Sequence, residues 1–276
     1  MLNALARQVR DLPALPQAVL EARQLLASED VAFEPLADAI SHDSALAADL
    51  LRLANSSLYG LAGRVRTVRD AVSVLGLRNL DMLLTAAALR SALRPMGGGP
   101  FDALSHWRHG VATGLCAFHL AAERKQQRDA AFTAGLLHDL GRLAMACVAP
   151  EKMQELLVRQ AAEDAPALGL EQQIWGTDHA AFGAIVAQHW HFGTDIAEAI
   201  RLHHAPAERP LTPLVDIVHV ADAMVHALDI NALPAERVPA IHPMAWNRLA
   251  LSDEACLRLF EQTEAGLGEL CQALGL

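Results

Sequence analysis

The stretch AGLLHDLGRLAM, residues 134–145, places an imidazole and a carboxylate side by side at His138 and Asp139, in a run that is otherwise almost entirely apolar. Burying such groups costs free energy unless partners satisfy them. Consecutive side chains on a helix diverge by about 100°, so the pair can address one centre only if other helices approach from both sides. The stretch therefore predicts a polar centre inside a bundle of helices.

The composition describes a globular chain rather than a disordered one. Its 276 residues are 53% hydrophobic and 20% charged, with a net charge of -10. The sequence contains no charge-free run of about 18 residues, which is the length needed to span a membrane. We therefore expect no membrane partner. The four cysteines form no C-x-x-C pair, which favours reduced thiols and a cytoplasmic location.

One short run is basic, GRVRTVRD at 63–70, with Arg64, Arg66 and Arg69. Nucleic-acid binding needs clustered positive charge against the phosphate backbone. Because the whole chain is acidic, we interpret this run as a solvated loop face and place nucleic-acid binding last among the functions.

Apolar residues recur at spacings of three and four along nearly the whole chain, which predicts an all-α protein. The expected helices cover residues 16–27, 34–41, 44–57, 67–75, 77–92, 101–124, 129–147, 151–163, 168–176, 179–190, 194–204, 211–228 and 247–273.

The segment RPMGGGPF at 94–101 carries two prolines around three glycines and should separate two lobes. We expect a two-lobed helical bundle, with an N-terminal lobe over 1–94 packed on a C-terminal lobe over 101–276. A second break, LPAERVPAIHP at 233–243, should free the last helix to fold back over the body.

Polar residues occur singly or in adjacent pairs on several otherwise apolar helices. Besides the His138–Asp139 pair, they are His109, His179, His203, His204 and Asp222. Imidazole nitrogens and carboxylate oxygens around one point suit a divalent metal such as iron, manganese, zinc or magnesium, and helical bundles build such sites in their cores.

Each of these residues also has a plainer interpretation. A lone histidine on an apolar helix is more often hydrogen-bonded than metal-bound, and His203 and His204 could interact with the carbonyls that end their helix. His219 and His226 flank Asp222 at helical spacing, so a local hydrogen-bonded trio is an alternative to a long-range site.

The order of the polar residues resembles a known signature. His109, then His138 and Asp139 in HDLGR, then Asp222 in VADA is similar to the H, HD, D signature of the HD-domain superfamily. Members of that superfamily bind divalent metals in a helical core and are often phosphohydrolases, so the resemblance implies both properties.

Further motifs resemble the HDOD branch, the HD-related output domains of bacterial signalling proteins. In the second lobe these are EQQIWGTDHAAFGAIVAQHW at 171–190 and IRLHH at 200–204. In the first lobe they are LPALP at 12–16, DSALAADLLRLANSSLYG at 43–60 and DAVSVLGLRNL at 70–80. The resemblance covers residues 11–228.

Two departures concern catalysis. Related HD-GYP phosphodiesterases carry a Gly-Tyr-Pro segment after the paired histidines, whereas this chain reads HHAPAERPLTPL at 203–214. Arg142 stands where HD enzymes commonly carry lysine, and a guanidinium does not exchange protons at neutral pH. We therefore expect no enzymatic turnover of cyclic dinucleotides.

The resemblance and its departures favour a regulatory module that acts on signalling proteins supplied in trans, without catalysis. The alternative is a metal-dependent phosphohydrolase acting on a nucleotide or cyclic dinucleotide, with Arg142 and Arg201 binding phosphate. In either case, we expect an ion at His109, His138, Asp139 and Asp222, with His179, His203 and His204 available for a second ion.

Residues 44–57 and 77–92 are too apolar to be solvated on more than one face, so we predict that the two lobes pack as one body. Limited proteolysis at the glycines 97–99 should leave the fragments associated in size-exclusion chromatography. Two folded fragments that separate freely would contradict this prediction.

Overall fold

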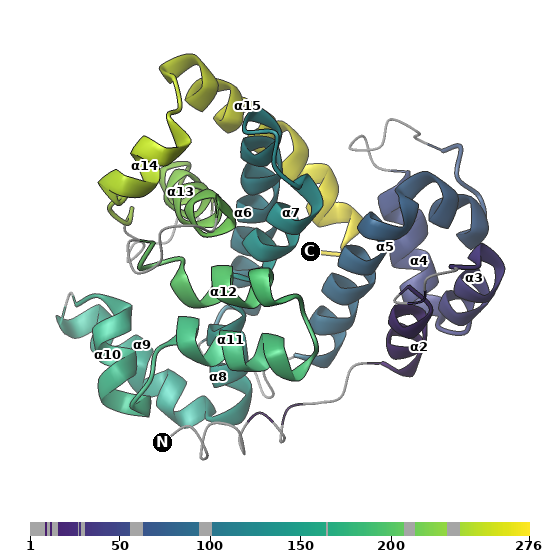
Figure 1. The fold of residues 1–276 in the computed structure, drawn as a ribbon. Coiled ribbons are helices and arrows are strands. Elements are labelled where there is room, and N and C mark those ends of the chain that lie inside the picture. Colours follow the sequence, from purple (N-terminus) through teal and green to yellow (C-terminus); the bar gives the residue numbers. More distant parts are fainter. Residues whose placement is uncertain are drawn as a thin grey trace. The chain divides into compact units, whose positions relative to one another are not determined.

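The computed structural model describes residues 9, 12, 16–26, 28, 31–55, 63–93, 101–163, 165–206, 213–230 and 238–276. Over these residues the regular structure is entirely helical, which confirms the all-α prediction (Figure 1). The helices are α2 (Gln17–Leu26), α3 (Phe33–Ser41), α4 (Ser44–Ala54), α5 (Val68–Ala92), α6 (Ala103–Glu123), α7 (Arg128–Leu137), α8 (Leu140–Val148), α9 (Pro150–Glu163), α10 (Ala167–Trp175), α11 (His179–His189), α12 (Thr194–Leu202), α13 (Pro213–Ala227), α14 (Pro243–Leu249) and α15 (Asp253–Ala273).

Contacts divide the chain into two compact units. One comprises Met1–Leu12 and Arg94–Ala265, and the other comprises Pro13–Leu93 and Gly266–Leu276. The division between the units therefore falls once within α15. None of the described helices combines the length and apolar character needed to cross a membrane.

In the unit that contains α2–α5, side chains define where helices begin and end. Thr67 and Asp70 form a capping box at the start of α5, each side chain accepting a hydrogen bond from the other's backbone N–H. After α4, the Asn55 amide pairs with both backbone groups of Val65, at 2.8 and 3.0 Å. The capping box satisfies backbone groups that a helix end leaves without partners, and Asn55 joins the end of α4 to the segment that precedes α5.

The basic run lies in this same unit. Arg64 and Arg66 are exposed, and Arg69 forms an ion pair with Glu34 at 2.9 Å between two exposed side chains. This arrangement agrees with a solvated face.

Helix breaks follow the prediction in one place and depart from it in two. Gly76 has non-helical angles (φ 71°, ψ 160°) inside α5, as the expected break between 75 and 77 requires. The helix expected over 129–147 is instead α7 and α8, separated by a turn at His138 and Asp139. The helix expected over 247–273 is divided by Ala250, whose φ is 44°.

A short turn at His138–Asp139 joins α7 to α8. His138 Nδ1 donates to the carbonyl of Gly135 at 2.7 Å, and the amide of Arg142 donates to the carbonyl of Asp139 at 2.9 Å. His138 keeps helical backbone angles (φ -55°, ψ -38°) as the C-cap of α7, whereas Asp139 departs from them (φ -96°, ψ 14°) before α8 begins.

Glycines allow α8 and α11 to cross closely. A Cβ atom on Gly141 would lie 1.9 Å from the carbonyl oxygen of His179, and one on Gly183 would lie 2.9 Å from the amide of Gly141. Both neighbours are backbone atoms, so no side-chain rotation could relieve the overlap. The crossing therefore places the start of α11 directly against the turn that carries the His–Asp pair.

Several predicted features lie in parts of the chain that the structure does not describe. They include the linker residues 94–100, residues 233–237 of the 233–243 break, residues 56 and 57 after α4, and residues 13–15 of the first motif.

Gly141→Ala should lower the free energy of unfolding by about 3 kcal/mol or more. Overpacking a core typically costs about 1–3 kcal/mol, and the backbone atoms that the new Cβ would meet cannot move aside as a flexible side chain could. Gly169→Ala is the matched control, since its added Cβ meets nothing within 4 Å in α10 and should stabilise by up to about 1 kcal/mol. Urea unfolding measures both, and equal midpoints would contradict the close crossing.

Candidate metal centre

The seven predicted ligands all belong to the unit that contains α6–α14. His109 lies on α6, the His138–Asp139 pair between α7 and α8, and Asp222 on α13. His179 begins α11, and His203 and His204 directly follow α12. All are buried except His204, which is half-buried.

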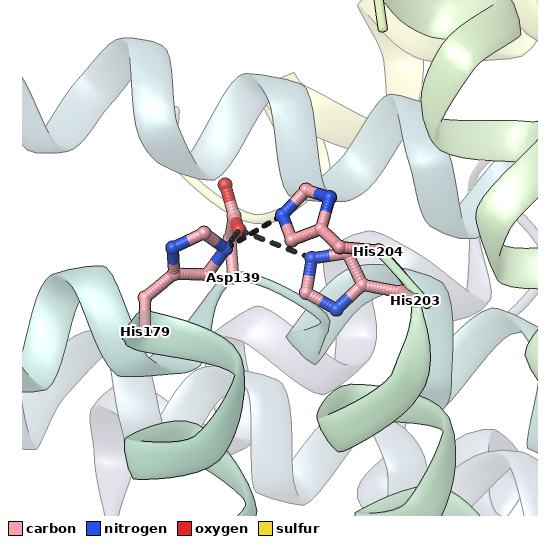
Figure 2. A group of neighbouring side chains, drawn as sticks. All are labelled: Asp139, His179, His203 and His204. Atoms are coloured by element: carbon pink, nitrogen blue, oxygen red, sulfur yellow. Dashed lines mark hydrogen bonds and ion pairs between the residues drawn. The ribbon is translucent and has the colours of Figure 1, made fainter. Parts of the chain in front are cut away.

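Three of the seven, His179, His203 and His204, lie around a fourth, Asp139. Its Oδ1 lies 3.0 Å from His179 Nε2 and 3.7 Å from His203 Nε2, and His179 Nε2 lies 2.9 Å from His204 Nε2. Figure 2 shows these four side chains pointing toward one another. Their donor atoms all lie within 4.8 Å of one another, a spacing that could accommodate a metal ion. We call these four residues the histidine-rich set.

The other three form a second group, which we call the Asp222 set. His109 Nε2 lies 3.0 Å from Asp222 Oδ1 and 3.2 Å from His138 Nε2. His138 Nε2 lies 3.4 Å from the same Asp222 oxygen. The donor atoms of this set also lie within 4.8 Å of one another.

Asp139 faces both sets. While Oδ1 faces the histidine-rich set, Oδ2 lies 3.8 Å from His138 Nε2 in the Asp222 set. Asp139 was predicted to share an ion with His109, His138 and Asp222, whereas its nearest imidazole nitrogen belongs to His179. Asp139 therefore belongs to the histidine-rich set through Oδ1, and its Oδ2 faces the Asp222 set.

Three imidazoles have their Nδ1 atoms committed to buried acceptors. His138 donates to the Gly135 carbonyl and His203 to the Ile200 carbonyl, each at 2.7 Å. His179 Nδ1 lies 2.7 Å from Glu171 Oε2. A partner of this kind fixes the tautomer of a metal-binding histidine and leaves the Nε2 lone pair for the ion.

The three Nε2 atoms consequently face carboxylate oxygens, and those of His138 and His179 also face the Nε2 atoms of His109 and His204. His203 Nε2 is buried and has no hydrogen-bond partner among the described residues. Acceptors that face acceptors in a core need a proton or a cation between them. The residues present therefore fit divalent metal ions, and a proton is their competitor.

The carboxylates of the centre are ionised. Burial would raise the pKa of Asp139, but the charges of Arg142, His138 and His179 hold it well below its usual range. Burial acts in the same direction on Asp222, where hydrogen bonds from His109, His138 and His226 lower the pKa well below normal. Anionic oxygens are thus available on both sides of the centre.

Without metal, protons take up part of this negative charge. Burial lowers the pKa of His179, but the carboxylates of Glu171 and Asp139 outweigh it and raise the pKa to about 9. Burial is likewise overcome at His138, whose pKa is raised by Asp139 and Asp222. In contrast, burial and neighbouring imidazoles lower the pKa of His203 well below normal and that of His204 to about 4.

Arg142 and Glu171 support the histidine-rich set from the side. The Arg142 guanidinium lies 3.6 Å from Asp139 Oδ2 and 3.7 Å from Glu171 Oε1, with a third of its side chain exposed. Glu171 is fully buried and also accepts the backbone N–H of His179 at 2.9 Å. Burial raises the pKa of Glu171, but His179 and Arg142 lower it to about 2. Arg201 is exposed in the last turn of α12.

Glu171, His219 and His226 were not among the predicted site residues. His226 Nε2 lies 3.4 Å from Asp222 Oδ1, as the four-residue spacing predicted. His219 instead donates to the carbonyl of His203 at 2.6 Å and accepts from the amide of His242 at 2.8 Å. In the sequence, His219 stood out only through its three-residue spacing from Asp222. That spacing indicated Asp222 as its partner, whereas its hydrogen bonds join it to His203 and His242.

The family model of the HDOD domain matches residues 12–206. The chain belongs to the HDOD family. An uncharacterized protein of Treponema pallidum (strain Nichols) is 31% identical over 242 residues, which cover 86% of this chain and 46% of that protein. The chain therefore spans about half the length of this curated relative.

Two crystal structures share the fold. One, a protein of Shewanella amazonensis SB2B provisionally named a phosphohydrolase, is 26% identical with a TM-score of 0.71, covering 94% of this chain and 98% of its own. The other, a protein of Marinobacter aquaeolei VT8 provisionally named a signal transduction protein, is 25% identical with a TM-score of 0.76, covering 96% of this chain and 59% of its own.

Metal binding should release protons over a wider pH range than an ordinary histidine pKa of about 6.5 implies. His179, with its pKa at about 9, must lose its proton before Nε2 can bind an ion, so apparent affinity should rise with pH up to about 9. In the metal-free protein the same raised pKa stabilises the fold fully below about pH 6.5, and this contribution is lost as pH rises through about 9.

Isothermal titration of Mn²⁺ into chelator-treated protein, in buffers of different ionisation enthalpy, measures this release. Near pH 7.5 we expect about one proton or more per chain, falling toward zero above about pH 9.5. Binding heats that are the same in all buffers near pH 7.5 would mean that no proton is released. That result would contradict the protonation of His179.

Proposed function

We propose that this chain is a divalent-metal-dependent phosphohydrolase module of a signal-transduction protein. The observation that supports it best is the position of Asp139, with one oxygen facing each of two ligand sets. A carboxylate between two sets suits a pair of ions, a common arrangement in enzymes that hydrolyse phosphoesters. The provisional names of the two structural relatives agree with each half of this proposal.

The ions, when bound, would activate a water molecule and polarise a phosphoryl oxygen. The protein's residues would hold and orient them. His109, His138 and Asp222 would bind one ion, His179, His203 and His204 the other, and Asp139 both. Glu171 would hold the His179 ring in the orientation and tautomer that the ion requires.

Arg142 would bind the phosphate. Its guanidinium lies 3.6 Å from Asp139 Oδ2 and a third of its side chain is exposed, so an anionic group that reaches the centre would lie beside its positive charge. Arg142 cannot supply a proton to a leaving group. Substrates whose leaving group needs no acid, such as aryl phosphoesters that release a phenolate, are therefore favoured over nucleoside phosphoesters and cyclic dinucleotides, which release a sugar alkoxide.

A non-catalytic module is the second candidate, and it also has a specific observation in its favour. The Arg142 guanidinium interacts with Asp139 and Glu171 and so offsets charge within the centre. Ions bound there would tie several helices together and stabilise a surface for signalling partners supplied in trans. A cytoplasmic location suits both candidates.

Hydrolysis of p-nitrophenyl phosphoesters and a nucleotide panel, with Mn²⁺, Fe²⁺, Zn²⁺ or Mg²⁺, tests the proposal. The parent protein should show metal-dependent turnover, and Asp139→Asn should reduce it by at least about 100-fold because both ions lose a ligand. His189→Ala is the matched control, since this exposed histidine lies on the same helix as His179.

Metal analysis of the same preparations separates the two candidates. Bound metal without turnover, together with a lower thermal midpoint in His138→Ala, would favour the non-catalytic module. A parent protein that takes up no metal after reconstitution would contradict both.

A further inference from the structure

Residues beyond the region matched by the family model contact the pair of histidines that ends it. The match ends at residue 206, just after His203 and His204. Two side chains from α13 and α14, His219 and Arg248, form hydrogen bonds with backbone carbonyls of this short stretch.

His219 is fully satisfied and its tautomer is determined. Nδ1 faces the carbonyl of His203 at 2.6 Å, so this nitrogen must carry the proton. Nε2 accepts from the backbone N–H of His242 at 2.8 Å, so this nitrogen must carry the lone pair. The ring is buried, with 6% of the residue exposed. It therefore connects the residue before α14 to the backbone of a candidate metal ligand.

Arg248 makes a parallel connection from the end of α14. Its Nε and one terminal nitrogen each donate to a carboxylate oxygen of Asp216 at 2.6 Å, and the same terminal nitrogen donates to the carbonyl of Pro206 at 3.0 Å. Asp216 is buried on α13. A bidentate pair of this kind fixes direction as well as distance.

We propose that His219 and Arg248 are positioning residues that brace the His203–His204 backbone so that both imidazoles face Asp139. We call the two residues the brace. This inference rests on the proposed metal centre, and it assigns to α13 and α14 a role in holding the histidine-rich set.

The backbone of His203 is the place where a brace would act. Two consecutive histidines share one peptide unit, so fixing the His203 carbonyl limits the orientation of both rings. His203 Nδ1 is already bound to Ile200, which fixes the ring to its own helix but not to α13. The brace supplies that second attachment, and α13 also carries Asp222 of the other set.

Two substitutions at His219 separate its two hydrogen bonds. Asparagine places an amide N–H where Nδ1 stood, so His219→Asn can still donate to the His203 carbonyl. Glutamine places its terminal oxygen where Nε2 stood, so His219→Gln can accept from His242 but leaves the His203 carbonyl without its donor. A purely space-filling role would not distinguish the two variants in this order.

The experiment is Mn²⁺ binding to the full chain, followed by electron paramagnetic resonance and by metal analysis. The parent should bind two ions that are magnetically coupled. His219→Gln should bind the second ion about 10- to 100-fold more weakly, as substitutions behind metal ligands do, and its spectrum should become that of isolated Mn²⁺. His219→Asn should remain close to the parent.

Arg248→Ala should weaken binding of the same ion. This variant tests the proposal if His219→Gln does not fold. Arg258→Ala, which removes an exposed ion pair with Glu123 in the same unit, should leave binding unchanged. Two coupled ions of unaltered affinity in His219→Gln and Arg248→Ala would overturn the brace but not the metal centre. A parent without bound metal would overturn both.

Discussion

The convergence of imidazole lone pairs on ionised carboxylates, inside a helical core, is the constraint on which the rest of this unit depends. Asp139 and Asp222 keep their charge although they are buried. His203 presents a buried nitrogen that no described donor satisfies. Such a cluster is costly unless positive charge enters it, either as protons on His179 and His138 or as divalent ions. Metal binding then replaces the protons on His179 and His138 with divalent ions, and the ions do not enter a neutral cavity.

The fold is adapted to this cluster at several places. Helix α7 ends at Leu137, and Asp139 departs from helical backbone angles before α8 begins. Gly141 and Gly183 let α8 and α11 approach until the backbone of His179 touches the turn. Glu171 is buried without exposure to solvent, and it serves His179 through both a ring nitrogen and the backbone amide. In each case, regular helix or an apolar contact is replaced by an arrangement that orients one polar group of the centre.

The sequence predicted the helical class, the break at Gly76 and the identities of the converging residues, because periodicity and residue type carry that information. It did not predict the break at His138–Asp139, since LLHDLGRL continues a helical pattern and the turn depends on tertiary contacts. Nor did it predict which set Asp139 faces more closely. The acceptors that orient the rings include the carbonyls of Gly135 and Ile200, and backbone atoms leave no mark in a sequence.

The central claim is that two sets of ligands, joined by Asp139, bind two cations. Anomalous diffraction at the manganese edge, from crystals of the full chain grown with Mn²⁺, tests it most directly. The account predicts two peaks in each chain, one next to His109, His138 and Asp222 and the other next to His179, His203 and His204. Density for Asp139 should contact both peaks. A centre without anomalous signal, while manganese occupies surface carboxylates in the same crystal, would contradict it.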